Sequence, residues 1–186
     1  IVFGDWSSDV CSSDLKPDFT PQKRDYKGEF LYLGRLSPEK NLSLLIDVFN
    51  ELPDLKLSIY GNGTERDTLT SKAGHNITFH EHIDNKKLKN VFTEHDFLIL
   101  PSLAEPWGLV VEEALYFGLP VILSERCGAS VLIEDGKNGF VIDPLSSEAL
   151  KNLLRNITNE NYQQLRQNVQ KLSINAKDEE QVSVYL

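Results

Sequence analysis

The stretch from residue 97 to residue 123 has a strand–loop–helix–strand pattern that limits the fold more than any other part of the chain. Residues 97–100 and 121–123 are apolar runs typical of buried strands. Between them, a loop containing proline, serine and glycine leads into a helical segment at about 109–117, which a glycine and a proline terminate. Two short apolar strands joined through a helix form a parallel pair, so this segment predicts a parallel sheet.

The same alternation of strands and helices continues along the rest of the chain. Further strands are predicted at 29–33, 55–60, 77–80 and 140–142. Helices are predicted at 64–73, 128–133, 147–157 and 161–172. A further helix is predicted to begin at Leu42, with Asn41 as its cap, and to end before Pro53. Another is predicted to follow an Asp84 cap and to run through Phe92. Strands alternating with helices of this length indicate an α/β domain with a Rossmann-like, doubly wound parallel sheet.

Length and charge narrow the class of function. The chain has 186 residues, enough for one domain with a substantial core. Its net charge is −9 and no basic run stands out, which argues against nucleic acid as a partner and against a polybasic membrane patch. No apolar stretch is long enough to span a bilayer, and two cysteines give no disulfide framework. With no signal-peptide pattern either, we expect a cytoplasmic location.

The start of the chain does not follow a protein-like pattern. Residues 1–15 show no helical or strand period and resemble the translated frame of a synthetic sequencing adapter. Our hypothesis is that they are an assembly artefact, and the alternative is a genuine disordered linker; the underlying DNA sequence distinguishes the two. Residues 16–28 are polar, contain two prolines and are predicted to be a linker. The domain itself is expected at 29–172, with a tail at 173–186.

Two glutamates flank the helix start in the 97–123 stretch. Glu105 lies in the loop at the carboxyl end of the strand, and Glu113 lies about one turn inside the helix, from where its side chain points back toward that loop. Ligands of open parallel sheets bind at the carboxyl ends of the strands, and a helix start offers N–H groups that suit phosphate. Because two acids would repel phosphate, we expect them to accept hydrogen bonds from sugar hydroxyls. The alternative is that both simply favour a helix N-terminus.

These residues also carry a family resemblance. The run Glu105-Pro-Trp-Gly-Leu-Val-Val-Glu-Glu113-Ala resembles the Glu-x7-Glu motif of the family 4 (group 1) retaining glycosyltransferases, which have the GT-B fold. Three further runs resemble the same family in their order and spacing, namely Pro101-Ser102, Gly118-x-Pro120-Val121 and Glu134-Asp-Gly136-Lys-Asn-Gly139-Phe. The family's paired glutamates lie eight positions apart and the second precedes alanine, which selects Glu113 rather than Glu112.

The resemblance implies what the chain is part of. It is similar to the C-terminal, donor-binding domain of enzymes that transfer a hexose from a nucleoside-diphosphate sugar to a saccharide or lipid-linked acceptor, as in polysaccharide biosynthesis. In such enzymes an acceptor domain precedes this one. We therefore expect the fragment to be inactive alone, and the missing domain to be the part that contacts the acceptor and reaches the inner face of the membrane. The tail at 173–186 resembles the segment that crosses back to that domain.

The resemblance also assigns roles to charged residues. Arg35 and Lys40, in the pattern Gly-Arg-Leu-x-x-x-Lys-Asn, resemble the pair that holds the donor's diphosphate. Cations are needed there because charge grows on the leaving phosphate as the glycosidic bond breaks. By the same resemblance, Glu113 takes the ribose hydroxyls of the nucleotide and Glu105 takes a hydroxyl of the transferred sugar. The alternative for an isolated Arg and Lys on a loop is ordinary solvated charge.

Backbone groups complete the predicted site. Trp107, Gly108 and Leu109 are expected to contact the sugar and phosphates, and Gly61, which ends the second strand, is expected to let the ligand lie close. For Gly61 the alternative is an ordinary turn. No Asp-x-Asp motif is present, so neither a metal nor another cofactor is expected. His80 and His82 share a strand face, but no third ligand follows at a convincing spacing, so zinc is not expected.

Two other kinds of function use similar features. A GT-B-like nucleotide-sugar epimerase would use the same phosphate site, although the glutamate spacing and the basic pair favour transfer. A non-catalytic nucleotide-binding α/β module, such as a regulatory domain, would need only the fold. Product linked to an acceptor would identify the transferase, and an epimerised free donor would identify the epimerase. The non-catalytic module would be identified if no nucleoside-diphosphate sugar binds and the Glu113→Ala change has no effect.

Overall fold

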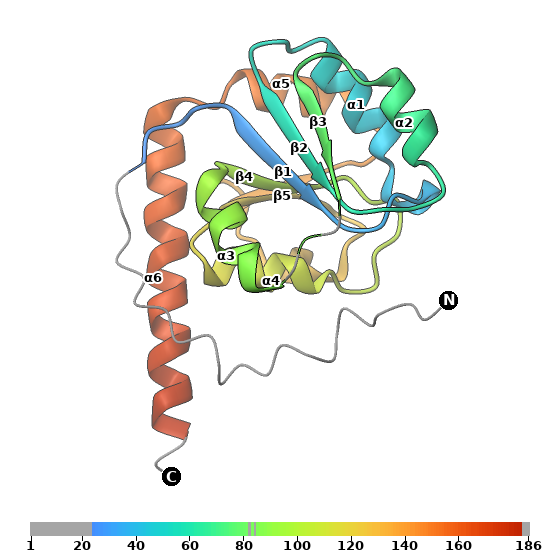
Figure 1. The fold of residues 1–186 in the computed structure, drawn as a ribbon. Helices are drawn as coiled ribbons and strands as arrows, with labels where there is room; N and C mark the ends of the chain where they lie inside the picture. Colours follow the sequence, from blue (N-terminus) through green and yellow to red (C-terminus); the bar gives the residue numbers. More distant parts are fainter. Residues whose placement is uncertain (1–23, 82, 84, 184–186) are drawn as a thin grey trace, which may run out of the picture.

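The computed structural model describes residues 24–81, 83 and 85–183 as a sheet with helices on both faces (Figure 1). Its six strands are parallel throughout and follow the order β3-β2-β1-β4-β5-β6. This is a doubly wound order, so the predicted Rossmann-like fold is confirmed. The strands are β1 (Glu29–Leu33), β2 (Lys56–Tyr60), β3 (Ile77–His80), β4 (Phe97–Leu100), β5 (Val121–Ser124) and β6 (Gly139–Ile142).

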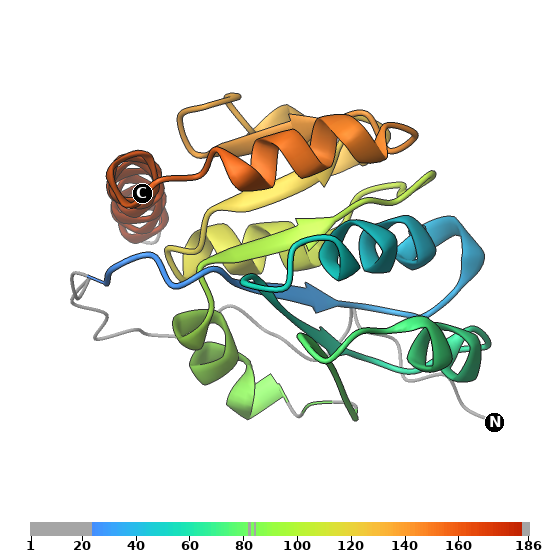
Figure 2. The ribbon, with the colours of Figure 1, turned by 90° about the horizontal axis from the view of Figure 1, so that it is seen from above.

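The helices form the outer layers. They are α1 (Leu42–Asn50), α2 (Arg66–Lys72), α3 (Asn85–Glu94), α4 (Leu109–Tyr116), α5 (Ser147–Arg155) and α6 (Asn159–Ser183), with short 3-10 turns η2 (Pro38–Lys40) and η3 (Gly128–Leu132). Figures 1 and 2 show α1 and α5 side by side on one face, with α3 and α4 on the other. Of the helices in the described residues, none is both long enough and apolar enough to cross a bilayer.

The core lies where the two central strands meet. Every residue of β4 is buried, as is every residue of β5, which is the pattern of a strand covered on both faces. Phe30 of β1 is paired in register with Phe97 of β4, and their rings stack with centroids 5.7 Å apart. The Phe49 ring from α1 meets Phe30 edge-on at 5.3 Å, which anchors that helix on the sheet.

The last helix is longer than its sequence predicts. The apolar periodicity ends near Leu172, but α6 continues as one helix to Ser183, so most of the predicted tail is helical. This stretch contains no glycine or proline to end a helix, and that permits the extension of a helix that is packed against α4. The predicted Asp84 cap lies outside the described residues.

Asn41 occupies the N-cap position of α1 but does not cap it as predicted. Its backbone is left-handed, with φ of +57°, and its side chain accepts no hydrogen bond from the helix. Instead, Nδ2 donates to the carbonyl oxygens of Pro101 at 3.2 Å and Pro144 at 2.7 Å. Asn41 therefore ties together the segments that follow β1, β4 and β6.

Residues 24–28, the described part of the predicted linker, are packed against the sheet. The Tyr26 ring meets Phe30 and Phe97 edge-on at 6.4 Å each and lies 5.6 Å from the Tyr162 ring of α6. Burial raises the pKa of Tyr162 to about 12, so its hydroxyl is neutral at physiological pH. This segment therefore joins the start of β1 to α6.

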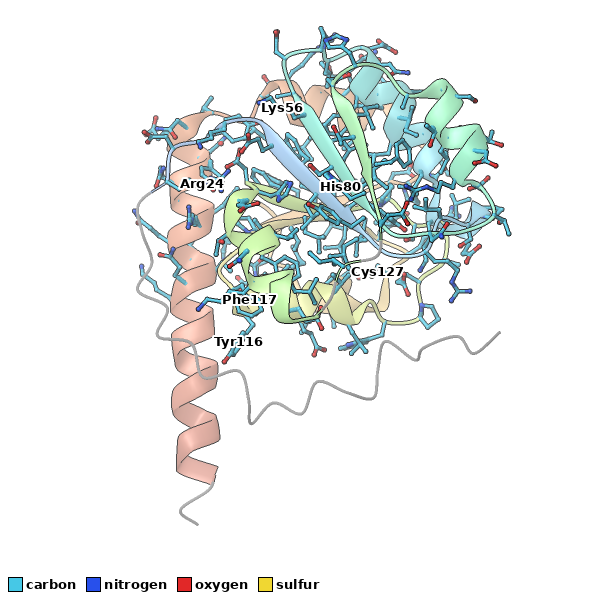
Figure 3. The ribbon with its side chains drawn as sticks, viewed as in Figure 1. Arg24, Lys56, His80, Tyr116, Phe117 and Cys127 are labelled. Atoms are coloured by element: carbon cyan, nitrogen blue, oxygen red, sulfur yellow. The ribbon has the colours of Figure 1, made fainter. Side chains whose placement is uncertain are left out.

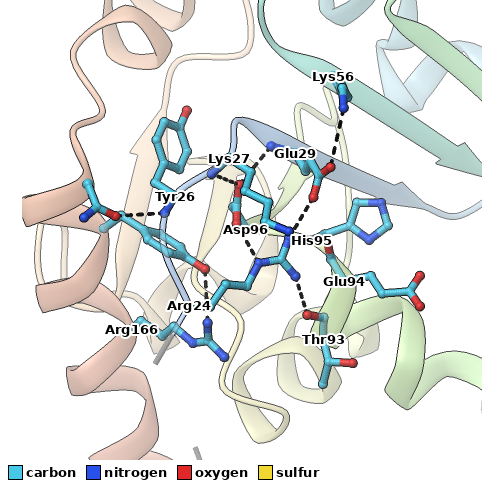
Figure 4. Close-up of polar contacts among 12 residues, drawn as sticks. Arg24, Tyr26, Lys27, Glu29, Lys56, Thr93, Glu94, His95, Asp96 and Arg166 are labelled. Atoms are coloured by element: carbon cyan, nitrogen blue, oxygen red, sulfur yellow. Dashed lines mark hydrogen bonds and ion pairs between the residues drawn. The ribbon is translucent and has the colours of Figure 1, made fainter. Parts of the chain in front are cut away.

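A buried aspartate holds the same segment by its backbone (Figure 4). Asp96 is fully buried just before β4, and its Oδ2 accepts the N–H groups of Lys27 and Glu29, each at 2.9 Å. Arg24 Nε lies 3.2 Å from Asp96 Oδ1, which balances the buried charge. The guanidinium also donates to Glu29 Oε2 at 2.7 Å, so it connects the segment to β1.

Candidate functional site

The loops that follow β1 and β4 lie together at the carboxyl edge of the sheet. From β1 the chain adds β2 and then β3 on one side of the sheet. It then returns to place β4 on the other side of β1, so β1 and β4 form the switch point of the topology. The loops, residues 34–41 and 101–108, are joined by a hydrogen bond from Leu103 N to Glu39 O at 2.8 Å. We call this pair of loops the switch-point edge. Figure 3 shows Cys127 and His80 far from Arg24 and Lys56, which belong to the other end of the sheet.

Two predicted site residues meet directly at the switch-point edge. Lys40 Nζ donates to Glu105 Oε2 in an ion pair, and the two side chains are only 15% and 16% exposed. The sequence predicts separate partners for them, a phosphate for Lys40 and a sugar hydroxyl for Glu105. The structure brings them together as partners of each other.

Two buried neutral groups lie within electrostatic reach of this ion pair. The buried Tyr32 hydroxyl donates to Arg35 O at 2.7 Å, and burial, followed by the charge of Glu105, raises the Tyr32 pKa. The Cys127 thiol donates to Trp107 O at 3.0 Å, and burial raises its pKa as well. Both groups are therefore neutral donors that are already engaged with backbone carbonyls. Sequence patterns did not identify either as part of the site.

The loop that carries Glu105 is built as an extension of the sheet. Glu105 N donates to Arg126 O at 3.3 Å and Gly128 N donates to Glu105 O at 2.9 Å, as in a parallel strand pair beyond the end of β5. Ala129 N then donates to Trp107 O at 2.9 Å. These bonds fix the loop backbone, because its position depends on β5 as well as on β4.

The start of α4 presents free backbone donors, as the sequence predicts. Gly108 is the N-cap, with φ of +95°, and no described residue accepts a hydrogen bond from the N–H groups of Gly108 and Leu109. Trp107 and Leu109 are exposed beside them. Trp107 Nε1 donates to Glu112 Oε1 at 2.6 Å, so the first glutamate of the Glu-Glu pair anchors an aromatic ring at the surface.

Glu113, one turn into α4, is a half-buried acid. Burial, followed by the neighbouring charge of Glu112, raises its pKa. Within the described residues, no group donates a hydrogen bond to its carboxylate. A partly desolvated carboxylate without donors is unfavourable, and a ligand that supplies hydroxyl groups would relieve it.

Arg35 is an exposed cation on the loop after β1. Among the residues that the structure describes, none forms an ion pair with its guanidinium or accepts a hydrogen bond from it. Its backbone is held by the Tyr32 hydroxyl, and the next residue, Leu36, donates its N–H to Asn62 O at 2.9 Å. The guanidinium is therefore available to an anion while its attachment point is fixed.

Gly61 is required by the protein backbone itself. A Cβ at this position would lie 1.9 Å from the carbonyl oxygen of Gly34, and φ is +142°. The ends of β1 and β2 thus approach so closely that no side chain fits between them. This contact accounts for the glycine without a ligand, which is a different reason from the one that the sequence suggests.

Replacing Gly61 by alanine is expected to destabilise the fold by about 2–4 kcal/mol, because the clash with Gly34 adds to backbone strain. Gly136 provides a matched control, since it also has a positive φ (+73°) but no atom lies within 4 Å of its added Cβ. We expect Gly136→Ala to cost about 1 kcal/mol. Urea unfolding of both variants measures the difference, and equal losses would show that the close approach of the strands has no energetic weight.

The histidines considered for metal binding are placed differently. The His80 ring stacks on Tyr60, with centroids 4.2 Å apart and planes 9° from parallel, and burial followed by His95 lowers its pKa. Arg66 donates to His80 O at 3.1 Å and to Gly61 O at 2.8 Å, which joins the ends of β3 and β2. His82 lies outside the described residues, and no group of three or more potential ligands occurs in the rest.

Comparison with known protein sequences identifies a family. The profile described as "Glycosyl transferases group 1" matches residues 16–177. Sulfoquinovosyl transferase SQD2 of Arabidopsis thaliana is 30% identical over 164 residues, which cover 82% of this chain and 32% of the relative. The GtfA subunit of a Streptococcus pneumoniae UDP-N-acetylglucosamine–peptide N-acetylglucosaminyltransferase is 32% identical over 154 residues, covering 78% and 30%. The chain thus spans about a third of the length of these relatives.

Solved structures share the fold. Anabaena Alr3699/HepE in complex with UDP and glucose aligns with a TM-score of 0.71 and 24% identity, covering 84% of this chain and 48% of that one. The C-terminal domain of a glycosyl transferase group 1 family protein (LpcC) from Francisella tularensis aligns with a TM-score of 0.70 and 22% identity, covering 81% and 86%. The family profile matches most of this chain, and these structures share its architecture. The chain therefore belongs to the group 1 glycosyl transferases and has the Rossmann-like sheet of their GT-B fold.

Proposed function

We propose that this domain binds the nucleoside-diphosphate sugar from which a retaining glycosyltransferase transfers a hexose to a saccharide or lipid-linked acceptor. The observation that carries the proposal is Glu113, a half-buried carboxylate that lacks a hydrogen-bond donor among the described residues. It stands beside a helix start with free N–H groups and near the loop that carries the exposed cation Arg35. A ribose diol next to a diphosphate has the donors and the charge that this arrangement accepts.

The proposal divides the ligand between the two loops. Arg35 and Lys40 hold the diphosphate and stabilise the charge that develops on it as the sugar leaves. The Gly108 and Leu109 N–H groups add neutral donors to the phosphates. These cations and amides do the work that a metal ion does in other transferases, so we propose a site that functions without one.

The two glutamates take the hydroxyl groups of the donor. Glu113 accepts both ribose hydroxyls, and Glu105 accepts a hydroxyl of the transferred sugar, next to the backbone of Trp107. The HepE structure, which holds UDP and glucose, is consistent with a ligand of this class on this fold. Gly61, at the end of β2, is not given a ligand contact in this proposal, because the close approach of Gly34 already accounts for it.

The acceptor contacts are proposed to come from a preceding domain of a cytoplasmic enzyme. Retaining transfer needs an acceptor hydroxyl positioned against the sugar, and the described residues offer a donor site alone. We therefore expect this chain by itself to bind donor and to transfer no sugar. A substantial turnover by the isolated chain, measured by acceptor glycosylation, would contradict this part of the proposal.

Donor binding itself is tested with a ligand panel. UDP-glucose, UDP-N-acetylglucosamine, ADP-glucose and GDP-mannose are titrated by calorimetry in the presence of EDTA. At least one is expected to bind, and at about 100 times its Kd to stabilise the native state by about 2.7 kcal/mol, which raises the Tm by roughly 5–10 °C. If none binds, a non-catalytic α/β module is the better description. If a bound donor is epimerised in the absence of acceptor, the epimerase alternative is correct.

A further inference from the structure

The Lys40–Glu105 ion pair places two ligand-binding groups in contact with each other. Both side chains are largely buried, so the contact is a partly desolvated ion pair rather than an exposed surface pair. Under the proposed function, however, Lys40 bonds to phosphate and Glu105 to sugar. Binding of a donor must therefore break the Lys40–Glu105 ion pair and replace it by two contacts to the ligand, one from each side chain.

We infer that Glu105 competes with the diphosphate for Lys40, and that this competition makes the site favour the sugar-loaded donor over the free nucleoside diphosphate. The inference rests on the proposed function and adds selectivity to it. The loaded donor brings hydroxyl groups that satisfy Glu105 when Lys40 turns to the phosphates. The free diphosphate brings none, so it leaves Glu105 unpaired.

The surroundings of Glu105 determine the cost of leaving it unpaired. Two buried neutral side-chain donors that feel the charge of Glu105 are already committed, since the Tyr32 hydroxyl bonds to Arg35 O and the Cys127 thiol bonds to Trp107 O. Within the described residues, Lys40 is the only side chain that donates to the Glu105 carboxylate. A largely buried carboxylate that loses its cation while an anion enters beside it is strongly disfavoured.

The loop backbone does not allow Glu105 to move away from this situation. Its N–H and C=O are both bonded to the segment after β5, at 3.3 Å and 2.9 Å. Gly108 packs beside its side chain, because a Cβ on Gly108 would lie 3.4 Å from Glu105 Cγ. The backbone therefore holds Glu105 at the switch-point edge, beside the proposed diphosphate position, and we expect the free diphosphate formed after transfer to be held less tightly than the loaded donor.

The test compares UDP with UDP-glucose, and GDP with GDP-mannose as a second pair, by calorimetry of the whole chain. Glu105→Gln removes the competitor, so the affinity for the free diphosphate is expected to rise about fivefold to tenfold. The affinity for the sugar-loaded donor is expected to stay equal or to fall. The preference for the loaded donor should then fall about fivefold or more.

A double-mutant cycle separates the ion pair from the simple loss of a negative charge. In a Lys40→Ala background, Glu105→Gln is expected to lose the gain in affinity for the free diphosphate, because there is no cation left to release. Glu39→Gln is the matched control: Glu39 is exposed and adjacent to Lys40, but its carboxylate bonds to Ser37 at 2.6 Å instead. It is expected to change the affinity by less than about twofold.

The outcomes distinguish this inference from the proposed function. If the wild-type chain binds no donor and no diphosphate, the proposed function fails and the inference fails with it. If the wild type binds but Glu105→Gln gives no gain, or the same gain with Lys40→Ala, only the inference is overturned. If the Gln variant does not fold, Glu105→Asp replaces it, because aspartate retains the charge but has a shorter side chain. This variant is expected to bind the free diphosphate more tightly than the wild type, by less than the Gln variant would. An unchanged affinity of the Asp variant overturns the inference equally.

Discussion

Donor binding is expected to weaken roughly tenfold to a hundredfold when Glu113 is replaced by glutamine, because one to two charge-assisted hydrogen bonds to the ribose are lost. Calorimetry with the best ligand of the donor panel measures the change. Glu112→Gln is the matched control, since the two residues are adjacent on α4 and the charge change is the same. The Glu112 carboxylate is exposed and bonds to Trp107 instead, so its replacement should change the affinity by less than about twofold.

The same substitution is expected not to destabilise the free domain. Burial raises the pKa of Glu113 above its usual 4.5, which means that the native state disfavours the ionised form. An acid whose pKa is higher in the folded than in the unfolded state reduces stability at neutral pH, and this loss is recovered as the pH falls through the folded-state pKa. Neutral glutamine removes the loss at all pH values. The Tm of Glu113→Gln at neutral pH should therefore equal or exceed that of the wild type.

The affinity for the donor should decrease as the pH falls, which is opposite to the effect of Glu113 on the stability of the free domain. The ionised carboxylate is the form that accepts two hydroxyl donors, so affinity is expected to fall on acidification, and the raised pKa of Glu113 makes this fall begin at a higher pH than for an ordinary carboxylate. Glu113→Gln should lack this component. A Gln variant that binds donor as tightly as the wild type, or that loses affinity only because its Tm has collapsed, would contradict the ribose assignment.

The largest loss of stability is expected at Asp96, at the opposite end of the sheet from the site. Asp96→Ala should destabilise the native state by about 3–5 kcal/mol, because it leaves the Arg24 guanidinium without its buried counter-charge and frees the N–H groups of Lys27 and Glu29 (Figure 4). Urea unfolding measures this loss. Donor affinity, measured under conditions in which the variant is folded, should be unchanged.

Asp47→Ala is the matched control for this prediction. Asp47 also forms an ion pair, with Lys72 at 2.6 Å, but its side chain is 53% exposed. The expected loss is less than about 1 kcal/mol. Similar losses for the two aspartates would show that burial does not govern the strength of these pairs and that residues 24–28 are not held as described.

The elements of the fold were largely predictable because they depend on local spacing. Apolar runs such as 97–100 and 121–123 are strands, and the helix from Leu109 begins and ends within a residue of its predicted limits. Glycine and proline mark these ends, since glycine allows backbone conformations that a helix does not use and proline fixes φ and removes an N–H donor. The helical continuation from 173 to 183 was not predicted, because it has no apolar stripe of its own.

Contacts between side chains were much less predictable. Asn41 has the residue type of a helix cap, but its left-handed backbone directs the amide to Pro101 and Pro144. Gly61 has the appearance of a ligand-contacting glycine, whereas the carbonyl of Gly34 already excludes a side chain there. In each case the residue type permits several partners, and the partner depends on which distant segment lies alongside.

The sequence alone determined the alternation of strands and helices, the parallel sheet, and which charged residues follow the strands at their carboxyl ends. It did so because hydrophobic period and backbone restriction act over a few neighbouring residues. Only the tertiary structure decided that Lys40 faces Glu105 and that, in the described part of the chain, Glu113 receives no hydrogen bond on its carboxylate. These relations arise where loops after non-consecutive strands meet, and a charge is defined by what packs around it rather than by its place in the chain.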